Sequence, residues 1–315
     1  MSTILVTGGT GFIGQAVVRH LAEAGHRVRI LLRASRSTPN LPRGVPVEVA
    51  VSSLDDGRGL RAALVGVDTV YHLIGGEWRG AYASLMDIDI RGTQNVVAAA
   101  ADASVKRIFY VSHLGADRAS AYPVFKAKAI AEEYIRRSGI DFTILRTAIV
   151  FGMNDGFTTG LAQLMSFIPF SFFVPGDGET LLQPLWVEDL ATCMAGALGD
   201  ENTINQLYEL GGPEYLTFNQ IARAVMDNIG LQRRLLHLRP PYLRAITVFL
   251  ETLTPKLPVS VYWLDYLATN RTCSLDTLPR QFNLMPARMS QRLDYLKGRN
   301  WRRETWRSIL PRRPA

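Results

Sequence analysis

The feature that most constrains the fold of this sequence is a glycine-rich turn close to its N-terminus. A short apolar run, Ile4-Leu5-Val6, leads into Gly8, Gly11 and Gly14, and apolar residues then recur at helical spacing before a second apolar run over 28–32. This order predicts a strand, a tight turn, a helix and a second strand. Glycine at the three positions allows the turn, lets backbone N–H groups approach a pyrophosphate, and lets the helix pack closely on the strand. The sequence therefore predicts a dinucleotide-binding βαβ unit.

The alternation of strand and helix continues along the chain and predicts an α/β fold. It is typical of a doubly wound parallel sheet, the Rossmann fold, with helices on both faces. Beyond residue 212, proline-rich joints separate helical segments, and we expect a smaller, mostly helical C-terminal lobe. The expected strands are 28–32, 47–51, 69–73, 107–112, 142–145 and 207–210, and the clearest expected helices are 92–101 and 127–137.

These patterns divide the chain into three parts. Residues 1–212 form the predicted dinucleotide-binding domain, in which 151–184 contribute to the substrate side, 213–296 form the smaller lobe, and 297–315 form a basic tail. No charged residue occurs between Asp155 and Asp177, but the prolines and glycines there would break a membrane-spanning helix. We therefore interpret this segment as a buried loop or as the wall of an apolar pocket.

The positive charge of the sequence is concentrated at its C-terminal end. The net charge is +7, and the tail contributes +6 of it, so the other 296 residues are nearly neutral. No basic face suited to a nucleic-acid backbone emerges, and we predict no nucleic-acid partner. Trp301 and Trp306 lie among the tail arginines, a combination that suits a protein groove or the headgroup region of an anionic membrane. The alternative is a solvated basic terminus.

The sequence lacks the signs of a metal site and of secretion. Its two cysteines, Cys193 and Cys273, are far apart, and its five histidines show no ligand spacing. The first residues carry no cationic leader and no long apolar stretch. We therefore expect a cytoplasmic protein without a metal, peripheral at the inner face of a membrane if the tail docks there.

The residues after the second strand predict which dinucleotide is preferred. A site for NAD would place an acid there to accept a hydrogen bond from the ribose 2′-hydroxyl, but no acid occurs until Glu48. Arg33 and Arg36, with Ser35 between them, suit a 2′-phosphate because guanidinium groups offer paired donors to phosphate oxygens. The alternative is a pair of solvated loop arginines. We predict a preference for NADP(H) over NAD(H).

Five segments of the sequence resemble the extended and atypical short-chain dehydrogenase/reductase superfamily, which includes NAD-dependent epimerases and dehydratases. These segments are Thr7–Gly14, Asp68–Leu73, Arg91–Val96, Tyr110–Ser112 and Leu145–Gly152. In addition, Ser112–Asp117 and Gln183–Asp189 are similar to the branch with the nucleotide-binding accessory subunit of respiratory complex I and photosystem-assembly factors. Besides the residues after the second strand, the resemblance implies a cofactor site formed by Gly8, Thr10, Gly11, Phe12, Ile13, Gly14, Ser53, Leu54, Leu73, Ile74, Gly75, Lys128 and Thr147.

The sequence departs from the superfamily's catalytic pattern, which is Tyr-x-x-x-Lys on one helix and a serine on the preceding strand. Ser112 matches the serine, and Tyr122 with Lys126 has the required spacing. However, a glutamate four residues later and a Ser-Gly pair ten residues later match Lys128 to the family lysine, which leaves Val124 at the tyrosine position. The resemblance therefore implies an intact cofactor site and a damaged proton donor, with Ser112, Tyr122 and Lys128 as the candidate catalytic residues.

Two other positions depart from the superfamily. Ser53 stands where an aspartate often accepts a hydrogen bond from the adenine amino group, and Asp89 stands where an asparagine is frequent. Ser53 would be a poorer acceptor for adenine.

Two functions remain open from the sequence. The first is an NADPH-binding, short-chain-dehydrogenase-like oxidoreductase that reduces an apolar carbonyl or quinone-like substrate. The second is a catalytically weak or inactive NADPH-binding accessory or assembly subunit of a membrane redox or photosynthetic complex. The apolar segment before Asp177 favours the first function, whereas Val124 and the basic tail favour the second.

Overall fold

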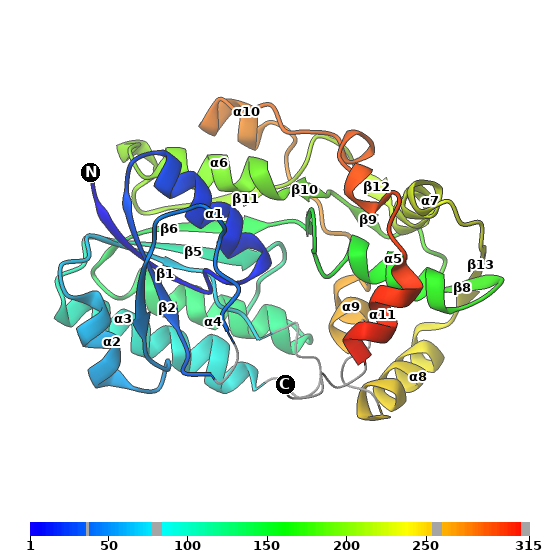
Figure 1. The fold of residues 1–315 in the computed structure, drawn as a ribbon, viewed down its shortest axis with the longest axis horizontal. Helices are drawn as coiled ribbons and strands as arrows, with labels where there is room; N and C mark the ends of the chain where they lie inside the picture. The colour runs from blue at the N-terminus through cyan, green and yellow to red at the C-terminus, as the bar shows by residue number, and fades with distance from the viewer. Residues whose placement is uncertain (36–37, 77–83, 254–259, 310–315) are drawn as a thin grey trace.

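A computed structural model describes residues 1–35, 38–76, 84–253 and 260–309, and a seven-stranded sheet lies at its centre (Figure 1). The strand order is β11-β6-β5-β4-β1-β2-β3, and every neighbouring pair is parallel. The direction in which strands are added reverses between β1 and β4, as in a doubly wound sheet. The predicted fold class is confirmed.

The elements of this domain agree with the predicted ones to within a few residues. Helix α4 begins at Pro123, earlier than expected, because proline fits the first turn of a helix, where the N–H group has no partner. The strands are β1 (Thr3–Thr7), β2 (Arg27–Leu32), β3 (Glu48–Val51), β4 (Thr69–His72), β5 (Arg107–His113), β6 (Asp141–Thr147) and β11 (Gln206–Leu210), and the helices are α1 (Phe12–Glu23), α2 (Gly57–Leu64), α3 (Gly92–Asp102), α4 (Pro123–Arg136) and α6 (Val187–Ala197).

Side chains alternate between the two faces of the sheet, and each face has its own core. In β1, Ile4 and Val6 belong to the core under α1 and α6, whereas Leu5 belongs to the core under α2, α3 and α4. Figure 1 shows these two groups of helices on opposite sides of the sheet. The hydroxyl of Tyr71 in β4 donates to the carbonyl of Met194 in α6 at 2.8 Å. Burial on both faces explains why the strands read as continuous apolar runs.

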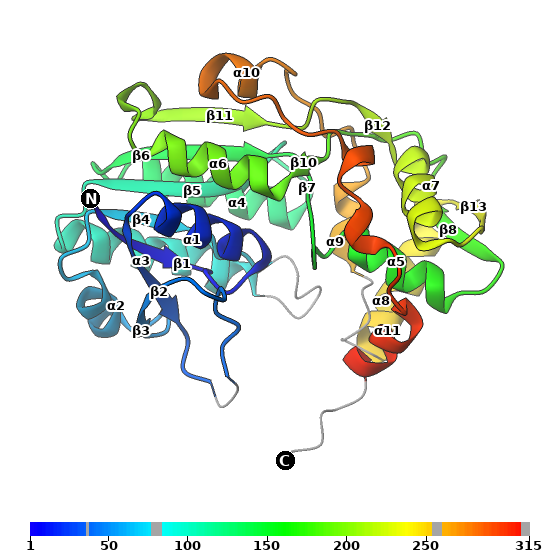
Figure 2. The same cartoon turned by 45° about the horizontal axis from the view of Figure 1, so that its top comes forward.

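A C-terminal lobe packs beyond the carboxyl ends of the strands (Figure 2). Its core gathers aromatic and aliphatic residues of α5, α7 and α9, with Phe157, Phe218 and Tyr266 among them. Its elements are β7 (Val150–Phe151), α5 (Thr158–Phe167), β8 (Ser171–Pro175), β9 (Leu181–Leu182), β10 (Leu185–Trp186), β12 (Leu216–Thr217), α7 (Phe218–Ile229), β13 (Arg234–Leu238), α8 (Pro240–Leu253), α9 (Val261–Tyr266) and α11 (Trp301–Ile309). Helix α10 (Thr277–Phe282) instead packs on α6 and β11 of the sheet domain.

The uncharged segment before Asp177 is regular rather than a loop. It forms α5 and β8, and β8 pairs in parallel with β13, a strand that the sequence pattern did not predict. Phe172 and Val174 of β8 are buried in the core of the lobe while Phe173 between them is half exposed. The expectation of an irregular loop was therefore wrong, because the pairing partner of β8 lies about sixty residues away and carries no clear alternation.

The first part of the basic tail is packed against the lobe. Helix α11 buries Trp301, whose indole N–H donates to the carbonyl of Leu296 at 3.0 Å, and it packs on α5. Arg302 and Arg303 are exposed on the same helix. A solvated terminus is therefore the wrong description for this part of the tail, whereas residues 310–315 lie outside the described residues.

We expect Gly14→Ala to destabilise the protein, because its Cβ would lie 2.1 Å from the carbonyl oxygen of Gly8, where no flexible group can give way. Overpacking of this kind costs about 1–3 kcal/mol, which urea unfolding would measure. A matched control is Gly196→Ala in α6, where a Cβ meets nothing within 4 Å. This change should stabilise the helix by up to about 1 kcal/mol. Equal effects of the two changes would contradict the close contact between α1 and the turn.

Candidate functional site

The glycine-rich turn lies where the strand order reverses, beside the carboxyl ends of β1 and β4. Gly8 has φ of +74°, in the left-handed region that favours glycine. Gly11 is exposed, and as the N-cap residue of α1 it supplies no side-chain acceptor. The neighbouring residues Thr10, Phe12 and Ile13 are all half-buried. The first N–H groups of α1 thus have no side-chain cap among the described residues, an arrangement that suits a pyrophosphate.

The segment Leu73-Ile74-Gly75 runs beside this turn. The N–H of Leu73 donates to the carbonyl of Thr7 at 3.1 Å, and a Cβ on Gly8 would lie 2.9 Å from the backbone of Leu73. The N–H of Gly76 donates to Asp89 Oδ2 at 3.0 Å. The structure therefore brings this predicted part of the cofactor site against the glycines.

The residues after β2 lie on the open side of the same edge. Arg33 and Ser35 are exposed, and β2 runs next to β1, so they follow the strand that neighbours the glycine turn. Arg33 has no carboxylate partner among the described residues. Arg36 lies outside the described residues. Their predicted contact with a 2′-phosphate stays a prediction.

The loop after β3 carries an acid that the sequence reasoning missed. Ser53 and Leu54 are half-buried, and the carbonyl of Leu54 accepts from the side-chain amide of Asn95 in α3 at 2.8 Å. The hydroxyl of Ser53 donates to the carboxylate of Asp55 and lowers the pKa of that exposed acid. Asp55 therefore lies beside Ser53 as a stronger acceptor for an amino group than Ser53 itself.

A buried chain of hydrogen bonds joins β1, β4 and α3. Thr7 Oγ1 lies 2.8 Å from His72 Nδ1, and His72 Nε2 lies 3.0 Å from the hydroxyl of Thr93, which donates to the carbonyl of Asp89 at 2.5 Å. Burial lowers the pKa of His72 to about 3, so the imidazole is neutral at pH 7. These hydrogen bonds hold Asp89 in place in the π-helical segment Met86–Arg91, just before α3.

Asp89 forms a buried ion pair with Lys128. The Lys128 ammonium lies 3.0 Å from Asp89 Oδ1, and the two side chains are 3% and 1% exposed. A charged ammonium group this deeply buried needs a carboxylate to offset its loss of hydration. This need explains why position 89 is an aspartate rather than an asparagine. Lys126, the alternative lysine, is exposed on the other side of α4. The structure therefore distinguishes the two lysines by burial, and the part of either in binding a cofactor stays a prediction.

Ser112 is fully buried, and its hydroxyl forms a hydrogen bond with another buried side chain. It donates to Glu132 Oε1 at 2.5 Å, and the same carboxylate receives two N–H groups of Arg146, the shorter contact being 2.7 Å. The hydroxyl of Thr147 donates to the carbonyl of Ser112 at 3.2 Å. These contacts fix the end of β5 against β6 and give Ser112 a structural partner.

Val124 lies in the core of the lobe and is 6% exposed. It lies one helical turn before Lys128 on α4, and its side chain has no group that can donate a proton. Tyr122 is the N-cap residue of α4 and is half-buried, with its ring against Phe125 at a centroid distance of 6.2 Å. Tyr122 therefore lies at the N-terminal end of α4, more than one helical turn before Lys128.

An aromatic cluster around His113 is the main feature that the sequence reasoning missed. His113 ends β5, directly after Ser112, and its Nε2 lies 3.5 Å from the hydroxyl of Tyr262 in α9. Phe125 and Tyr266 contact the same imidazole edge-on. No spacing signal predicted this cluster, because Tyr262 lies 149 residues after His113.

Arg271 closes the cluster from one side. Its guanidinium lies 3.8 Å from the ring centroid of Phe125 and also over Tyr266, and the residue is 7% exposed. Desolvation lowers the pKa of Arg271, and the described residues include no carboxylate that pairs with it. The positive φ of Gly115 brings the backbone close to this guanidinium. The cluster therefore combines a cation, an imidazole and phenols in an apolar surrounding.

An apolar cavity of about 140 Å³ lies next to this cluster. Its walls come from α5, β8, α8 and α9, and Trp263, which lines it, contacts Tyr262 at a ring distance of 5.0 Å. Leu161 and Phe172 of the uncharged segment also line it. The predicted wall of an apolar pocket is therefore present, formed by a helix and a strand.

Asp155 is a buried acid near the start of α5. Its carboxylate accepts from the N–H of Gly152 at 3.1 Å, the hydroxyl of Thr158 at 2.7 Å and the N–H of Thr159 at 2.7 Å. Burial outweighs these bonds and raises the pKa of Asp155 to about 6. It anchors the turn that brings Gly152 next to the ring of Phe12.

Together, the reversal in strand order, the glycine turn against α1 and the lobe beyond the carboxyl edge define an NAD(P)-binding Rossmann protein of the short-chain dehydrogenase and epimerase type. The chain belongs to the NmrA-like family, whose model matches residues 1–258. The predicted superfamily is thus confirmed.

Two curated relatives are similar over much of the chain. It is 29% identical over 264 residues to subunit 9 of the NADH dehydrogenase [ubiquinone] 1 alpha subcomplex of Arabidopsis thaliana, which covers 80% of this chain and 64% of that protein. It is 28% identical over 244 residues to a ceramide reductase of Caulobacter vibrioides, covering 76% and 74% of the two chains. The chain spans 64%, 61% and 58% of the lengths of three respiratory-subunit relatives.

Solved structures share the fold at low sequence identity. An NADPH-dependent quinone oxidoreductase from Escherichia coli, complexed with NADPH, superposes with a TM-score of 0.71 at 20% identity and covers 93% of this chain and 99% of its own. A UDP-glucose 4-epimerase from Thermotoga maritima gives a TM-score of 0.71 at 20% identity, with 96% and 99% covered.

The raised pKa of Asp155 predicts a pH dependence of stability. Its contribution is fully present below the unfolded value of 3.8 and is lost as pH rises through about 6. Between pH 4 and 7, wild type should therefore lose about 2–3 kcal/mol of unfolding free energy relative to Asp155→Asn. Urea unfolding of both proteins across this range would measure the difference. A constant difference would contradict a raised pKa.

Proposed function

We propose that this protein binds NADPH and reduces an apolar carbonyl or quinone-like substrate. The observation that carries the proposal is the apolar cavity, one wall of which, Trp263, contacts Tyr262 of the cluster around His113 at the carboxyl end of β5. Ligands of doubly wound sheets bind at this edge. Similarity to a ceramide reductase and to an NADPH-dependent quinone oxidoreductase complexed with NADPH supports the same reaction class.

The residues present fit a dinucleotide. Gly8 and Gly14 leave no room for side chains, so the backbone forms a cradle that a Cβ would fill. The N-terminus of α1 would hold the pyrophosphate, Leu73-Ile74-Gly75 would line its path, and Arg33 and Ser35 would hold the 2′-phosphate. Bound NADPH would supply a hydride from its nicotinamide ring.

The protein's own residues would bind the substrate and supply a proton. The cavity would hold the apolar part of the substrate and exclude water, and the Arg271 guanidinium would attract an oxygen that gains negative charge. Since Val124 cannot donate a proton, we assign this role to the phenol of Tyr262, with His113 as its hydrogen-bond partner. Tyr122 is the alternative donor, and Lys128 with Asp89 would position the cofactor side of the site.

A second candidate function is that of an NADPH-binding accessory or assembly subunit of a membrane redox complex. It is favoured by the bond from Ser112 to Glu132 and by the burial of Val124, since neither side chain is then placed for the reaction of the superfamily. The similarity to a subunit of the NADH dehydrogenase alpha subcomplex supports it as well. NADPH would in that case stabilise the fold without turnover.

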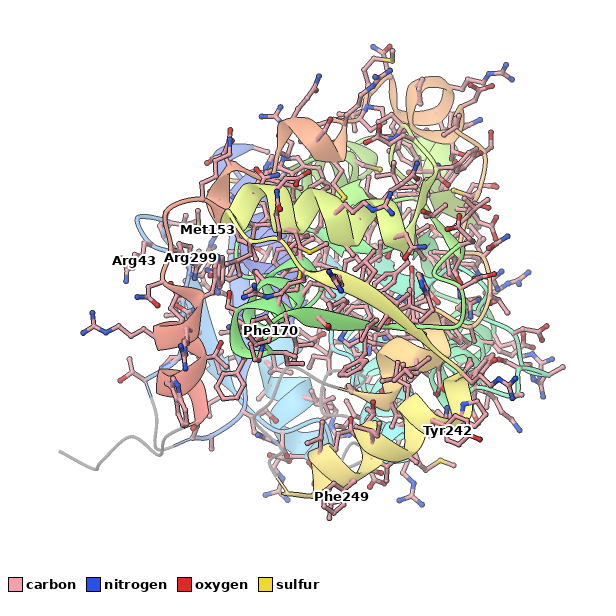
Figure 3. The ribbon with its side chains drawn as sticks, turned by 90° about the vertical axis from the view of Figure 1, so that its right-hand side faces the viewer. Arg43, Met153, Phe170, Tyr242, Phe249 and Arg299 are labelled. Atoms are coloured by element: carbon pink, nitrogen blue, oxygen red, sulfur yellow. The ribbon has the colours of Figure 1, made fainter. Side chains whose placement is uncertain are left out.

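The preference for NADPH is tested by Arg33→Ala. Loss of a charge-assisted contact to the 2′-phosphate should raise the Kd of NADPH about tenfold and leave that of NADH nearly unchanged. The matched control is Arg43→Ala, an exposed arginine on the same connection between β2 and β3, which should change neither Kd (Figure 3). Calorimetric titration of wild type and both variants with each dinucleotide measures the six Kd values. Equal affinities for the two dinucleotides in wild type would refute the preference.

The reductase is tested by NADPH oxidation with a panel of quinones, enones and ketones. We expect Tyr262→Phe to lower kcat about 100-fold with little change in KM, because the proton donor is lost and the ring is kept. Tyr134→Phe, on an exposed part of α4, is the control and should behave as wild type. If Tyr122→Phe causes the loss instead, Tyr122 is the donor. Tight NADPH binding without turnover of any substrate would support the accessory function.

A further inference from the structure

Helix α8 is apolar on the side that faces away from the protein. Tyr242 and Phe249 are 64% and 63% exposed, and Ile246 and Val248 are also exposed. On the inner side, Leu243 and Leu250 line the apolar cavity. An exposed apolar face of this kind is normally covered by protein or by lipid.

The charged side chains of α8 do not interrupt its outer surface. Arg244 is paired with Asp265 of α9, and Glu251 is buried and accepts the N–H of Val261. Both charges are thus used in contacts that hold α8 on α9. Tyr242, Ile246 and Phe249, spaced four and three residues apart, share the outer face, whereas Arg244 is about half exposed on another side of the helix.

The apolar surface continues from α8 onto the neighbouring strands. Phe170, in the turn between α5 and β8, is 82% exposed and has φ of +65°, a backbone conformation that is strained for a bulky residue. Phe173 of β8 and Leu236 of β13, which are partners in the strand pair, are both about two-fifths exposed. Figure 3 shows Phe170, Tyr242 and Phe249 on one face of the lobe.

Exposed arginines lie in the same lobe as this apolar surface. Residues 213–315 contain 17 Lys and Arg against 7 Asp and Glu, whereas residues 1–212 contain 18 against 21. Arg234 and Arg239 are exposed on β13 and just before α8, and Arg302 and Arg303 are exposed on α11. Figure 3 shows both helices at this end of the lobe, with α11 at the left and α8 at the bottom right. The positive charge therefore lies in the same lobe as the apolar face, and not in the tail alone.

We propose that α8 and the turn at Phe170 insert into the surface of an anionic lipid bilayer. An apolar helical face bordered by arginines is the pattern of helices that lie in the plane of the headgroup region. The 14 residues of α8 are too few to cross a bilayer, and no helix within the described ranges is long and apolar enough to do so. Because Ile246 and Phe173 both line the apolar cavity and are exposed, the cavity opens on the inserted face.

The proposal is tested by flotation of the full-length protein with vesicles, without cofactor or substrate, so its outcome is separate from that of the proposed reductase. We expect binding to phosphatidylcholine vesicles that contain about 30% phosphatidylglycerol, and weaker binding to phosphatidylcholine alone. Raising the salt concentration from about 0.05 M to about 0.5 M should weaken the first without abolishing it, since apolar insertion is not screened.

The variant that tests insertion is Tyr242→Ser/Phe249→Ser, which should lower the partition coefficient at least about tenfold. Its matched control is Met285→Ser, which removes an 83% exposed side chain just after α10, a helix that packs on α6 and β11. This control should bind as wild type. Arg302→Gln/Arg303→Gln should reduce the preference for anionic vesicles while keeping the remaining binding.

A reporter on α8 measures depth directly. Phe249→Trp adds an indole whose fluorescence should shift to the blue on vesicles and be quenched by lipids brominated on their acyl chains. Absence of vesicle binding, unchanged binding of the serine variant, or an indole that the brominated lipids leave unquenched would each overturn the proposal. A lipid-free dimer that the serine variant dissociates would overturn it as well, because a second copy would then cover α8.

Discussion

The close contact between α1 and the glycine turn is the constraint on which the rest of the structure depends. With no Cβ at Gly14, the helix approaches the carbonyl of Gly8 to a distance that no other residue permits. This approach sets the height of α1 over β1, and α6 then packs beside α1 through the ion pair of Arg19 with Glu188 at 2.9 Å. The carboxyl ends of the strands, the segment after β4 and the start of the lobe all meet at the edge that this contact defines.

The two halves of that edge have different chemistry. On the cofactor side, small residues and backbone groups are arranged as a Rossmann site requires, and Lys128 is held by Asp89 because a buried ammonium needs a buried carboxylate. Farther along the edge, the hydroxyl of Ser112 donates to Glu132, and Val124, one turn before Lys128, is buried in the core of the lobe. The aromatic cluster around His113 brings together phenol, imidazole and guanidinium groups from β5, α9 and the segment after α9.

The lobe carries both the exposed apolar surface of α8 and the excess of positive charge, which the sheet domain lacks. Its core includes Trp301, and the outer side of α8 and the arginines of α11 are at the surface. The inner side of α8, together with α5, β8 and α9, lines the apolar cavity. Exposed apolar surface of this extent is uncommon on a monomer and normally has a partner.

The sequence by itself determined the sheet domain, because its information is local. Glycine spacing, apolar runs and helical periodicity each arise within one element, and they predicted the strands and the dinucleotide turn. Tertiary structure alone decided the rest, because each of those contacts joins distant residues. The pairing of β8 with β13, the burial of Trp301, the contact of His113 with Tyr262 and the exposure of Phe249 depend on how the lobe folds back on the sheet, and no local pattern encodes which side of a helix will be covered.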